Sequence, residues 1–357
     1  MSTAVELTSS ALRDAWRGLQ EAKPGLRIRE CAEQLGVSEA QLLATTVGDY
    51  TTKLEGDWTE LLKRFPELGR VMSLTRNDSC VLEHKGPFQK IDIMGAGARA
   101  MATVIGPIES RVFFAGWKFG FAVRQQTPRG LQQSIQIFDQ SGTAVTKVFL
   151  VEEQGNKKGS NQEAFDKIIA DFKSAHQTQE VQVEKIAETP TKPIAEVNAV
   201  ELLTDWSNMK DTHDFFGILR KHNVNRLDAL YLATDYAYQL KKESLQTVLE
   251  AAAQTKLPIM IFAGNRGNLQ IHQGKVQTIK VMDQWLNVLD PDFNMHLRAD
   301  HIDTLWVVKK PTEDGVVTSI EAFDSNKNMI AQFFGLRKPG TPELKDWAAL
   351  VETLPKA

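Results

Sequence analysis

The sequence predicts an α+β protein made of two homologous domains in tandem, each with helices followed by a large antiparallel β-sheet. Three observations lead to this prediction. The halves of the 357-residue chain share aligned segments, apolar spacing changes from helical to alternating in each half, and a segment poor in apolar residues separates them. A chain of this length is also too long for one ordinary hydrophobic core.

The duplication is visible in three pairs of segments that occur in the same order in both halves. The pairs are 49–50 with 235–236, 77–86 with 265–274 at an offset of 188 (265 minus 77), and 124–139 with 309–324 at an offset of 185 (324 minus 139). The last pair has six of sixteen residues identical and no gap. Because a solenoid needs at least about three repeats, two repeats predict a tandem pair of domains.

The boundary between the repeats falls in residues 177–198. This segment has no aromatic residue, no glycine and two prolines, Pro190 and Pro193. It offers little apolar surface to offset the entropy lost on ordering, so an extended connector is expected. The prediction is an N-terminal repeat over 1–176, a connector over 177–198 and a C-terminal repeat over 199–357.

Each repeat begins with segments whose apolar residues recur at helical spacing and that end at glycine or proline. They cover 11–26, 28–35, 39–47 and 58–65 in the first repeat, and 197–209, 214–222, 227–238 and 244–253 in the second. After Leu68 and after Leu257 the apolar residues alternate, which predicts strands. In the first repeat these strands are expected at 71–75, 81–83, 112–114, 119–124, 134–138 and 145–151, with a hairpin turn at 139–142.

Composition describes an ordinary globular chain, with 42% hydrophobic and 24% charged residues. A net charge of −3 gives no global indication of binding to nucleic acid or to an anionic membrane. The two cysteines, Cys31 and Cys80, form neither a disulfide framework nor a zinc-ligand set. No apolar run reaches the roughly 18 residues of a membrane span, and the first six residues lack the features of a signal peptide. A soluble protein of a reducing compartment is therefore expected.

Two motifs resemble known binding elements but lack the features that those elements need in order to bind. Residues 95–100 imitate a dinucleotide-binding glycine loop, but the β-branched residues and Gly106-Pro107 that follow predict a turn between strands instead of the required helix. Residues 28–43 have the helix, glycine turn and helix of a DNA-reading motif. The second helix of that motif has no Lys or Arg and carries Glu39, so a packed helical pair is the favoured interpretation.

Hydrolytic catalysis has no motif in this chain, which contains neither GxSxG nor HExxH. Among the histidines, His84 and His272 occupy the same position of the repeat, which favours a structural role.

His213 differs, because Asp211 or Thr212 is expected to cap a helix that places His213 in its first turn. The positive end of the helix dipole disfavours imidazolium there, and a neutral imidazole is what a metal ligand requires.

A local basic cluster follows His213, with Arg220, Lys221 and Arg226 within thirteen residues. Histidine beside cations and aromatic residues suits a flat, apolar, dianionic iron porphyrin. On these features alone, a histidine on a helix surface without any ligand remains the simpler interpretation.

Four segments of the sequence are similar to segments of a known protein family. Residues 206–216 (WSNMKDTHDFF), 264–267 (GNRG), 285–288 (WLNV) and 310–320 (KPTEDGVVTSI) resemble the bacterial hemin-degrading or hemin-transport factor family, the HemS/ChuS-like haem-utilisation proteins. The resemblance covers nearly the whole chain and includes the duplication. It implies a cytoplasmic two-repeat α+β protein whose sheets stack at the centre, with haem in a cleft of the C-terminal half.

The resemblance also implies roles for individual residues. His213 is the axial, metal-binding ligand, and Arg111 is the second residue at the iron, so these two are the implied catalytic residues. Phe113 covers the porphyrin from the same strand face as Arg111. The remaining implied haem contacts are the cations Arg226, Lys310 and Arg337, the polar Gln332, and Phe334, where several members have tyrosine.

Two positions differ between the repeats or from the family. The repeat partner of Arg111 is His296 (296 minus 111 is 185), so the halves have diverged at the ligand-facing position. Some members bind a second haem through a histidine in the first half, and that position here is Leu82. The resemblance therefore leaves a second haem site doubtful.

The implied function is haem trafficking or storage in bacterial haem-iron uptake, together with haem degradation and iron release. The cofactor is haem (iron protoporphyrin IX), and degradation needs an external electron donor such as a reductase. A haem-uptake transporter is the implied upstream donor. A carrier that hands haem to a separate oxygenase without catalysis is the alternative, so enzymatic activity stays open. A DNA-binding regulator is the remotest alternative, and neither nucleic acid nor membrane insertion is expected.

Overall fold

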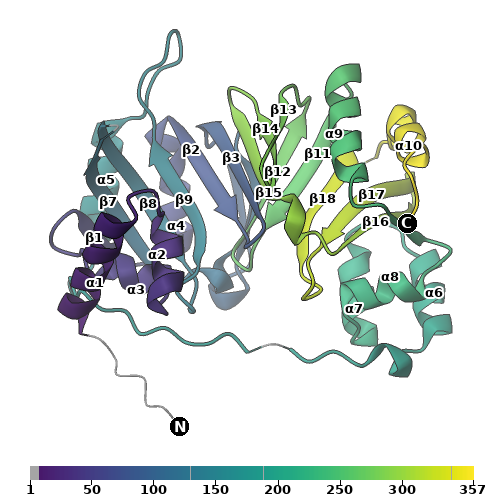
Figure 1. The fold of residues 1–357 in the computed structure, drawn as a ribbon, viewed down its shortest axis with the longest axis horizontal. Coiled ribbons are helices and arrows are strands. Elements are labelled where there is room, and N and C mark those ends of the chain that lie inside the picture. Colours follow the sequence, from purple (N-terminus) through teal and green to yellow (C-terminus); the bar gives the residue numbers. More distant parts are fainter. Residues whose placement is uncertain (1–7, 129, 188, 339) are drawn as a thin grey trace. The chain divides into compact units, whose positions relative to one another are not determined.

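The computed structural model describes residues 8–128, 130–187, 189–338 and 340–357. The first six residues, which bear on the signal-peptide prediction, therefore lie outside the described part. Each repeat folds as helices followed by antiparallel strands (Figure 1), which confirms the predicted α+β class.

The first repeat contains five α-helices and nine strands within the described residues. They are α1 (Ser9–Ala22), α2 (Ile28–Leu35), α3 (Glu39–Ala44), β1 (Thr51–Leu54), α4 (Trp58–Arg64), β2 (Arg70–Arg76), β3 (Cys80–Pro87), β4 (Lys90–Met94), β5 (Met101–Ile105), β6 (Glu109–Phe113), β7 (Phe119–Thr127), β8 (Gly130–Phe138), β9 (Ala144–Leu150) and α5 (Gln162–Phe172). Short 3₁₀ turns at Phe65–Leu68, Gly97–Arg99 and Phe114–Gly116 link some of them.

The second repeat follows the same order. Its elements are α6 (Ala199–Ser207), α7 (Asp214–His222), α8 (Arg226–Leu232), β10 (Ala237–Leu240), α9 (Ser244–Thr255), β11 (Ile259–Gly264), β12 (Asn268–Gly274), β13 (Ile279–Met282), β14 (Trp285–Leu289), β15 (Phe293–Arg298), β16 (Thr304–Thr312), β17 (Gly315–Phe323), β18 (Met329–Gly335) and α10 (Lys345–Glu352). Two further 3₁₀ turns span Ile194–Glu196 and Ala299–His301. Between the end of α5 and Ile194 the described residues form no helix or strand.

The strands form two nine-stranded antiparallel sheets. One has the order β1-β7-β8-β9-β2-β3-β15-β14-β13, and the other has the order β10-β16-β17-β18-β11-β12-β6-β5-β4. The two orders are equivalent strand for strand, since β10 corresponds to β1, β16 to β7 and β4 to β13. The duplication seen in the sequence is therefore also present in the topology.

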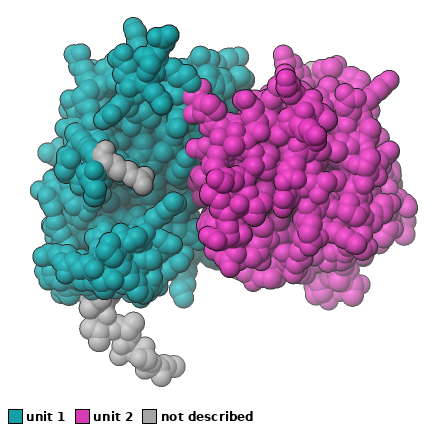
Figure 2. Space-filling model, turned by 45° about the horizontal axis from the view of Figure 1, so that its top comes forward, with its two compact units in different colours: residues 1–76, 83–187, 265–269 teal, residues 77–82, 188–264, 270–357 magenta. Residues whose placement is uncertain are grey.

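The chain divides into two compact units (Figure 2). Unit 1 comprises residues 1–76, 83–187 and 265–269, and unit 2 comprises residues 77–82, 188–264 and 270–357. Each unit thus includes a short segment of the other repeat. The apolar core of unit 1 contains Leu62, Phe65 and Phe165 among its fully buried side chains, and that of unit 2 contains Trp206 and Trp347.

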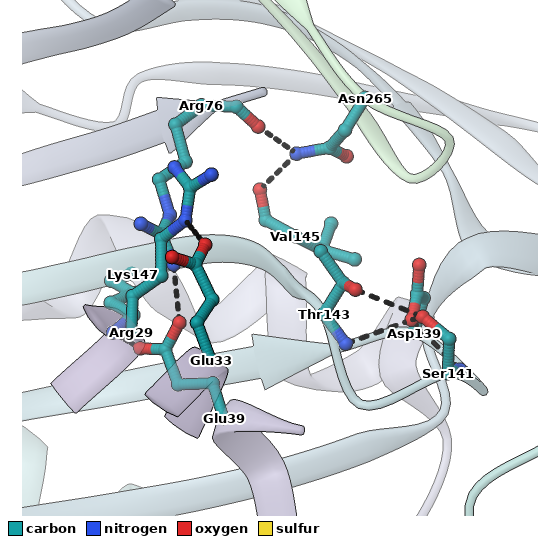
Figure 3. A network of polar contacts seen from close by, with 10 residues as sticks. All are labelled: Arg29, Glu33, Glu39, Arg76, Asp139, Ser141, Thr143, Val145, Lys147 and Asn265. Atoms are coloured by element: carbon teal, nitrogen blue, oxygen red, sulfur yellow. Dashed lines mark hydrogen bonds and ion pairs between the residues drawn. The ribbon is translucent and has the colours of Figure 1, made fainter. Parts of the chain in front are cut away.

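An asparagine anchors the segment of the second repeat that belongs to unit 1. The Asn265 side-chain amide donates hydrogen bonds of 2.8 Å to the carbonyl oxygens of Arg76 and Val145 (Figure 3). Its oxygen accepts a hydrogen bond of 3.0 Å from the backbone N–H of Gly267. A Cβ on Gly267 would lie 2.6 Å from Val145 Cγ1, so this close packing needs glycine.

Unit 2 repeats this arrangement with the equivalent asparagine. The Asn77 amide donates to the carbonyl oxygens of Gly264 at 3.3 Å and Ile330 at 2.8 Å. Its oxygen accepts from the backbone N–H groups of Ser79 and Cys80. Asn77 and Asn265 were aligned by the sequence repeat, and the structure shows the same hydrogen bonds at both positions.

All eight predicted helices are present, and 28–35 and 214–222 have the predicted bounds. The helix predicted at 227–238 was too long, because α8 ends at Leu232 and residues 237–238 belong to β10. The strand predictions were incomplete, because β1, β4 and β5 were missed in the first repeat, and the helix α5 was missed as well. β4 alternates between exposed and half-buried residues, so the hydrophobic pattern that marks other strands is weak there. The predicted hairpin turn is confirmed, with the Asp139 carboxylate accepting from the backbone N–H groups of Ser141 and Thr143 (Figure 3).

Both excluded motifs have the expected structures. Only a 3₁₀ turn at Gly97–Arg99 lies between β4 and β5, so no helix follows the glycine loop. The second helix of the DNA-like motif is α3, whose Glu39 is buried and paired with Lys147 and Arg76 (Figure 3). Five of the six residues of α3 are buried, so this helix offers no free face to a DNA groove.

Among the described helices, none combines the length and the apolar character that crossing a lipid bilayer requires.

Candidate functional site

His213 lies directly before α7 in unit 2, and its side chain is 93% exposed. The sequence predicted Asp211 or Thr212 as the helix cap, and this was wrong: the helix begins at Asp214 and His213 itself is the N-cap. The reason is the Asp214 carboxylate, which accepts hydrogen bonds from the backbone N–H groups of Lys210 (2.9 Å) and Asp211 (3.0 Å). The turn that precedes the helix is closed by the Asp214 backbone N–H, which donates to the carbonyl oxygen of Asp211 at 3.1 Å.

Asp211 fixes the orientation of the histidine. Its carboxylate accepts a hydrogen bond of 2.8 Å from the backbone N–H of His213 and also contacts the ring nitrogen Nδ1. The hydrogen bond from the His213 backbone is the main reason why the pKa of Asp211 lies below its ordinary value. A carboxylate at Nδ1 holds the proton there and leaves the Nε2 lone pair facing outward, which is the arrangement of a metal-ligating histidine.

A cluster of charged side chains forms around Glu321 of β17, whose side chain is fully buried. Arg226, the first residue of α8, donates to both carboxylate oxygens, with Nε–Oε2 at 2.7 Å and Nη2–Oε1 at 2.6 Å. The Lys310 ammonium donates at 3.0 Å and the Gln332 amide at 2.9 Å. Three residues predicted as haem contacts therefore converge on one carboxylate.

The sheet register explains this convergence. Glu321 of β17 lies opposite Gln332 of β18, and Lys310 is on β16, the other neighbour of β17. Side chains at alternate positions share one face of a sheet, so the three groups point to the same side. Arg226 then reaches the cluster from α8.

Burial and charge act against each other in this cluster. Burial lowers the pKa of Lys310 to about 8. Burial alone would raise the pKa of Glu321, but Arg226 and Lys310 outweigh it and hold this pKa well below its usual range. At neutral pH the cluster therefore contains two positive charges and one negative charge, which leaves one positive charge in excess.

Aromatic rings border the cluster. Phe215 of α7 is buried, with the Arg226 guanidinium 4.8 Å and the Lys310 ammonium 4.9 Å from its ring centre. Phe334 packs edge-to-face against Phe262 at 5.2 Å and lies 6.0 Å from the Lys310 ammonium. These contacts place apolar surface next to the excess positive charge.

Arg337 supplies a further cation, and its side chain is 14% exposed. One guanidinium nitrogen, Nη2, donates to Asp314 at 3.2 Å. Its Nε is buried and has no hydrogen-bond partner among the described residues. The positive charge of Arg337 also contributes to the lowered pKa of Asp211, so Arg337 lies on the His213 side of unit 2.

Arg111 and Phe113 belong to unit 1, on β6. They lie opposite Thr103 and Met101 of β5 and share one face of the strand, as predicted. The Arg111 guanidinium donates to the Glu109 carboxylate at 3.2 Å, and Phe113 is 36% exposed. The structure thus gathers Arg226, Lys310, Gln332, Phe334 and Phe215 in unit 2, and describes Arg111 and Phe113 within unit 1.

Sequence reasoning missed Glu321, Phe215 and the orienting role of Asp211. Glu321 carried a detectable signal, because it is a carboxylate within a strand whose neighbours Ile320, Ala322 and Phe323 are apolar. Its repeat partner, at an offset of 185, is the uncharged Gln136. Phe215 carried no such signal, since nothing in Phe215-Phe216 tells which ring is buried.

The fold and the site define a duplicated α+β protein whose second repeat gathers cations and aromatic rings around a buried carboxylate, with the exposed His213 directly before α7. The family model described as "Haemin-degrading HemS.ChuX domain" matches residues 36–172 and 223–354, and the chain belongs to this family. The family prediction made from the sequence is thereby confirmed.

Relatives match over nearly their whole length. Hemin transport protein HemS of Yersinia enterocolitica is 32% identical over 343 residues, covering 95% of this chain and 96% of the relative. The crystal structure of holo-PhuS, a heme-binding protein from Pseudomonas aeruginosa, superposes with a TM-score of 0.94 at 42% identity, covering 98% of this chain and 100% of PhuS. The heme degrading enzyme ChuS from Escherichia coli O157:H7 gives 0.89 at 31% identity, with coverage of 98% and 100%.

Proposed function

We propose that this protein binds haem on unit 2 with His213 as the axial ligand of the iron. The observation that carries the proposal is the exposed His213 ring held at Nδ1 by Asp211, which directs Nε2 outward. The relatives described as hemin transport and heme-binding proteins support the same ligand. A haem-linked iron already has four porphyrin nitrogens, so one protein nitrogen is enough to anchor it.

The residues of unit 2 also fit the rest of the haem. Its two propionates need cations, and the cluster of Arg226 and Lys310 carries excess positive charge even with Glu321 present. Arg337 offers the buried Nε that has no partner among the described residues. The macrocycle needs apolar contact, which Phe334 provides without the hydroxyl that several family members have there. Gln332 adds a polar contact beside these cations.

The proposal includes Arg111 and Phe113 of unit 1, which the family resemblance assigns to the iron and to the porphyrin face. Arg111 offers a hydrogen-bond donor and Phe113 a ring that is 36% exposed, which suit the assigned roles. This part of the proposal rests on the resemblance and is tested with the variant Arg111→Ala, which should shift the absorption bands of bound haem without unfolding the protein.

We further propose that the protein works in the cytoplasm on haem taken up by a transporter, as a carrier that also degrades haem when an electron donor is supplied. Relatives are described both as hemin transport proteins and as a heme degrading enzyme, which supports both activities. When bound, haem itself supplies the redox chemistry, and the protein supplies binding and orientation. Delivery of haem to a separate oxygenase is the second candidate.

A hemin titration of the purified protein, followed by visible absorption, tests the binding. We expect a saturable Soret band in the wild type and loss of defined coordination in His213→Ala. The variant His176→Ala, which removes another exposed histidine, is the matched control and should bind as the wild type does. Absence of a saturable band in the wild type would overturn the proposal.

The same complex separates degradation from transport. Ascorbate or a reductase is added in air, with catalase present to remove free peroxide. Bleaching of the Soret band to a tetrapyrrole product would identify a degrading enzyme, and a persistent band would identify a carrier.

A further inference from the structure

We infer that the exposed face of α7 next to His213 is part of the haem site, with Gly217 admitting the porphyrin close to the helix backbone and Phe216 packing against it. This inference rests on the proposed function and extends it to two residues to which the family resemblance assigned no role and which lie outside the buried cluster.

Gly217 has no role that the fold explains. It lies in the middle of α7, where glycine is disfavoured relative to alanine because it loses more backbone entropy. Its φ is not in the left-handed region, and a Cβ at this position would meet no atom within 4 Å. Neither the backbone conformation nor the packing within unit 2 therefore requires glycine at this position. A ligand that approached the helix backbone closely would require it.

Phe216 is a second residue that the fold does not use. It is 69% exposed, whereas the adjacent Phe215 is 1% exposed. The buried side of α7 is formed by Phe215, Ile218 and His222, so the helix packs on unit 2 without the Phe216 ring. An apolar ligand held by the adjacent His213 would cover this ring and remove its apolar surface from water.

The helical repeat places these residues beside the ligand histidine. His213, Phe216, Gly217 and Arg220 are spaced i, i+3, i+4 and i+7, so they follow one face of the helix. Gly217 lies about 6 Å along the helix axis from His213, at 1.5 Å per residue. A porphyrin whose iron is held by His213 would extend over this part of the helix.

The first repeat provides an internal comparison, because α2 is the equivalent of α7. Both helices end at a residue with positive φ, Gly36 (φ 68°) and Asn223 (φ 48°), which sets the offset at 187 (223 minus 36). At this offset the buried Cys31 of α2 matches the buried Ile218 of α7. The packing sides of the two helices are therefore alike.

The outward faces of the two helices differ. At the same offset, Phe216, Gly217 and Arg220 correspond to Arg29, Glu30 and Glu33. In α2 these are ordinary surface helix residues, since Arg29 and Glu33 form an ion pair at 3.0 Å (Figure 3) and Glu30 closes the capping box with Arg27. His213 itself corresponds to Leu26. The second repeat has thus replaced charged helix formers by an aromatic ring, a glycine and a cation on the face that carries the histidine.

The variant Gly217→Ala tests the inference. Alanine should raise the melting temperature, because it is the better helix former. It should weaken hemin binding about tenfold, because an added methyl group is difficult to accommodate against a closely packed ligand. Gly18→Ala is the matched control, since Gly18 also lies within an exposed helix and its Cβ would meet nothing within 4 Å. It should raise the melting temperature without changing hemin affinity.

Phe216→Ala is a second, independent variant, which should weaken hemin binding about tenfold without lowering the melting temperature. The inference is overturned if Gly217→Ala and Phe216→Ala bind hemin as the wild type does while His213→Ala loses its coordination. In that case haem binding through His213 stands and only the role of the α7 face fails. Failure of the wild type itself to bind hemin would instead reject the proposed function.

Discussion

Replacing Glu321 by glutamine should destabilise unit 2 by an amount that can be worked out from its contacts. The carboxylate is fully buried and accepts two hydrogen bonds from Arg226 and one from Lys310. Glutamine has nearly the same shape, so the change removes a charge and creates almost no cavity. Removing one partner of a buried ion pair costs about 3–5 kcal/mol, because the other charge stays buried without compensation.

The two cations contribute to this loss in different ways. Arg226 keeps its charge but loses the carboxylate charge and one of its two hydrogen bonds, because glutamine keeps one acceptor oxygen and replaces the other by an NH₂ donor; this accounts for most of the expected effect. Lys310 has a pKa of about 8 and can release its proton instead. At pH 7 that release costs at most about 1.4 kcal/mol, the equivalent of one pH unit. The part of the stability loss that comes from Lys310 should therefore vanish at pH 9, because this lysine is already neutral there in the wild type.

Urea unfolding followed by tryptophan fluorescence measures both quantities. We expect Glu321→Gln to lower the free energy of unfolding by about 3–5 kcal/mol at pH 7, and by about 1.4 kcal/mol less at pH 9. A loss below about 1 kcal/mol at pH 7, or a loss that does not change with pH, would refute the reasoning. Glu39→Gln, which removes the buried carboxylate of α3 in unit 1, should lower stability without changing hemin affinity.

Three further predictions follow from the site and from a buried histidine. Asp211→Asn should weaken hemin binding about 10- to 100-fold in a hemin titration, because it removes the charge that orients His213. Hemin affinity of the wild type should fall as the pH rises above about 8, because Lys310 then loses the positive charge that we propose for the propionates. Lys310→Met should abolish this dependence. Burial lowers the pKa of His272, stacked on Phe293 at 3.7 Å, to about 4. Between pH 6.5 and 4 the unfolded chain therefore binds a proton at His272 that the folded chain does not bind. The free energy of unfolding should consequently fall by up to about 3 kcal/mol as the pH drops through this range. In urea unfolding, His272→Phe should remove this pH dependence.

Each of these predictions has an outcome that contradicts it. Unchanged hemin affinity in Asp211→Asn would mean that the carboxylate does not orient the ligand. A wild-type affinity that stays constant from pH 7 to 9 would exclude a propionate contact through Lys310. An acid dependence of stability that is the same in His272→Phe and in the wild type would assign that dependence to other groups.

The helices of the two repeats were predictable from local pattern, whereas several strands were not. α2 and α7 have strong helical periodicity, a glycine or asparagine at the C-terminal end and buried residues on one face. β1 is four residues long and is buried only at its two ends, and β4 alternates but is five residues long and has no fully buried residue. Pairing with neighbours decides such strands, and neighbours that are distant in sequence leave no local signal.

The sequence by itself determined the duplication, the helix before which His213 lies and the residues that match the family. It also indicated that Asn77 and Asn265 are equivalent, and the hydrogen bonds agree. These properties depend on residue type and on short spacings, which can be read along the chain.

Only the tertiary structure decided how those residues act together. Arg226 and Glu321 are 95 positions apart, and the register of β16, β17 and β18 brings Lys310 and Gln332 to the same carboxylate. The structure also decided which of Phe215 and Phe216 is buried. The physical reason is that burial and charge pairing depend on three-dimensional neighbours, so a lysine or a phenylalanine acquires its pKa or its exposure only after the sheet and the helices have packed.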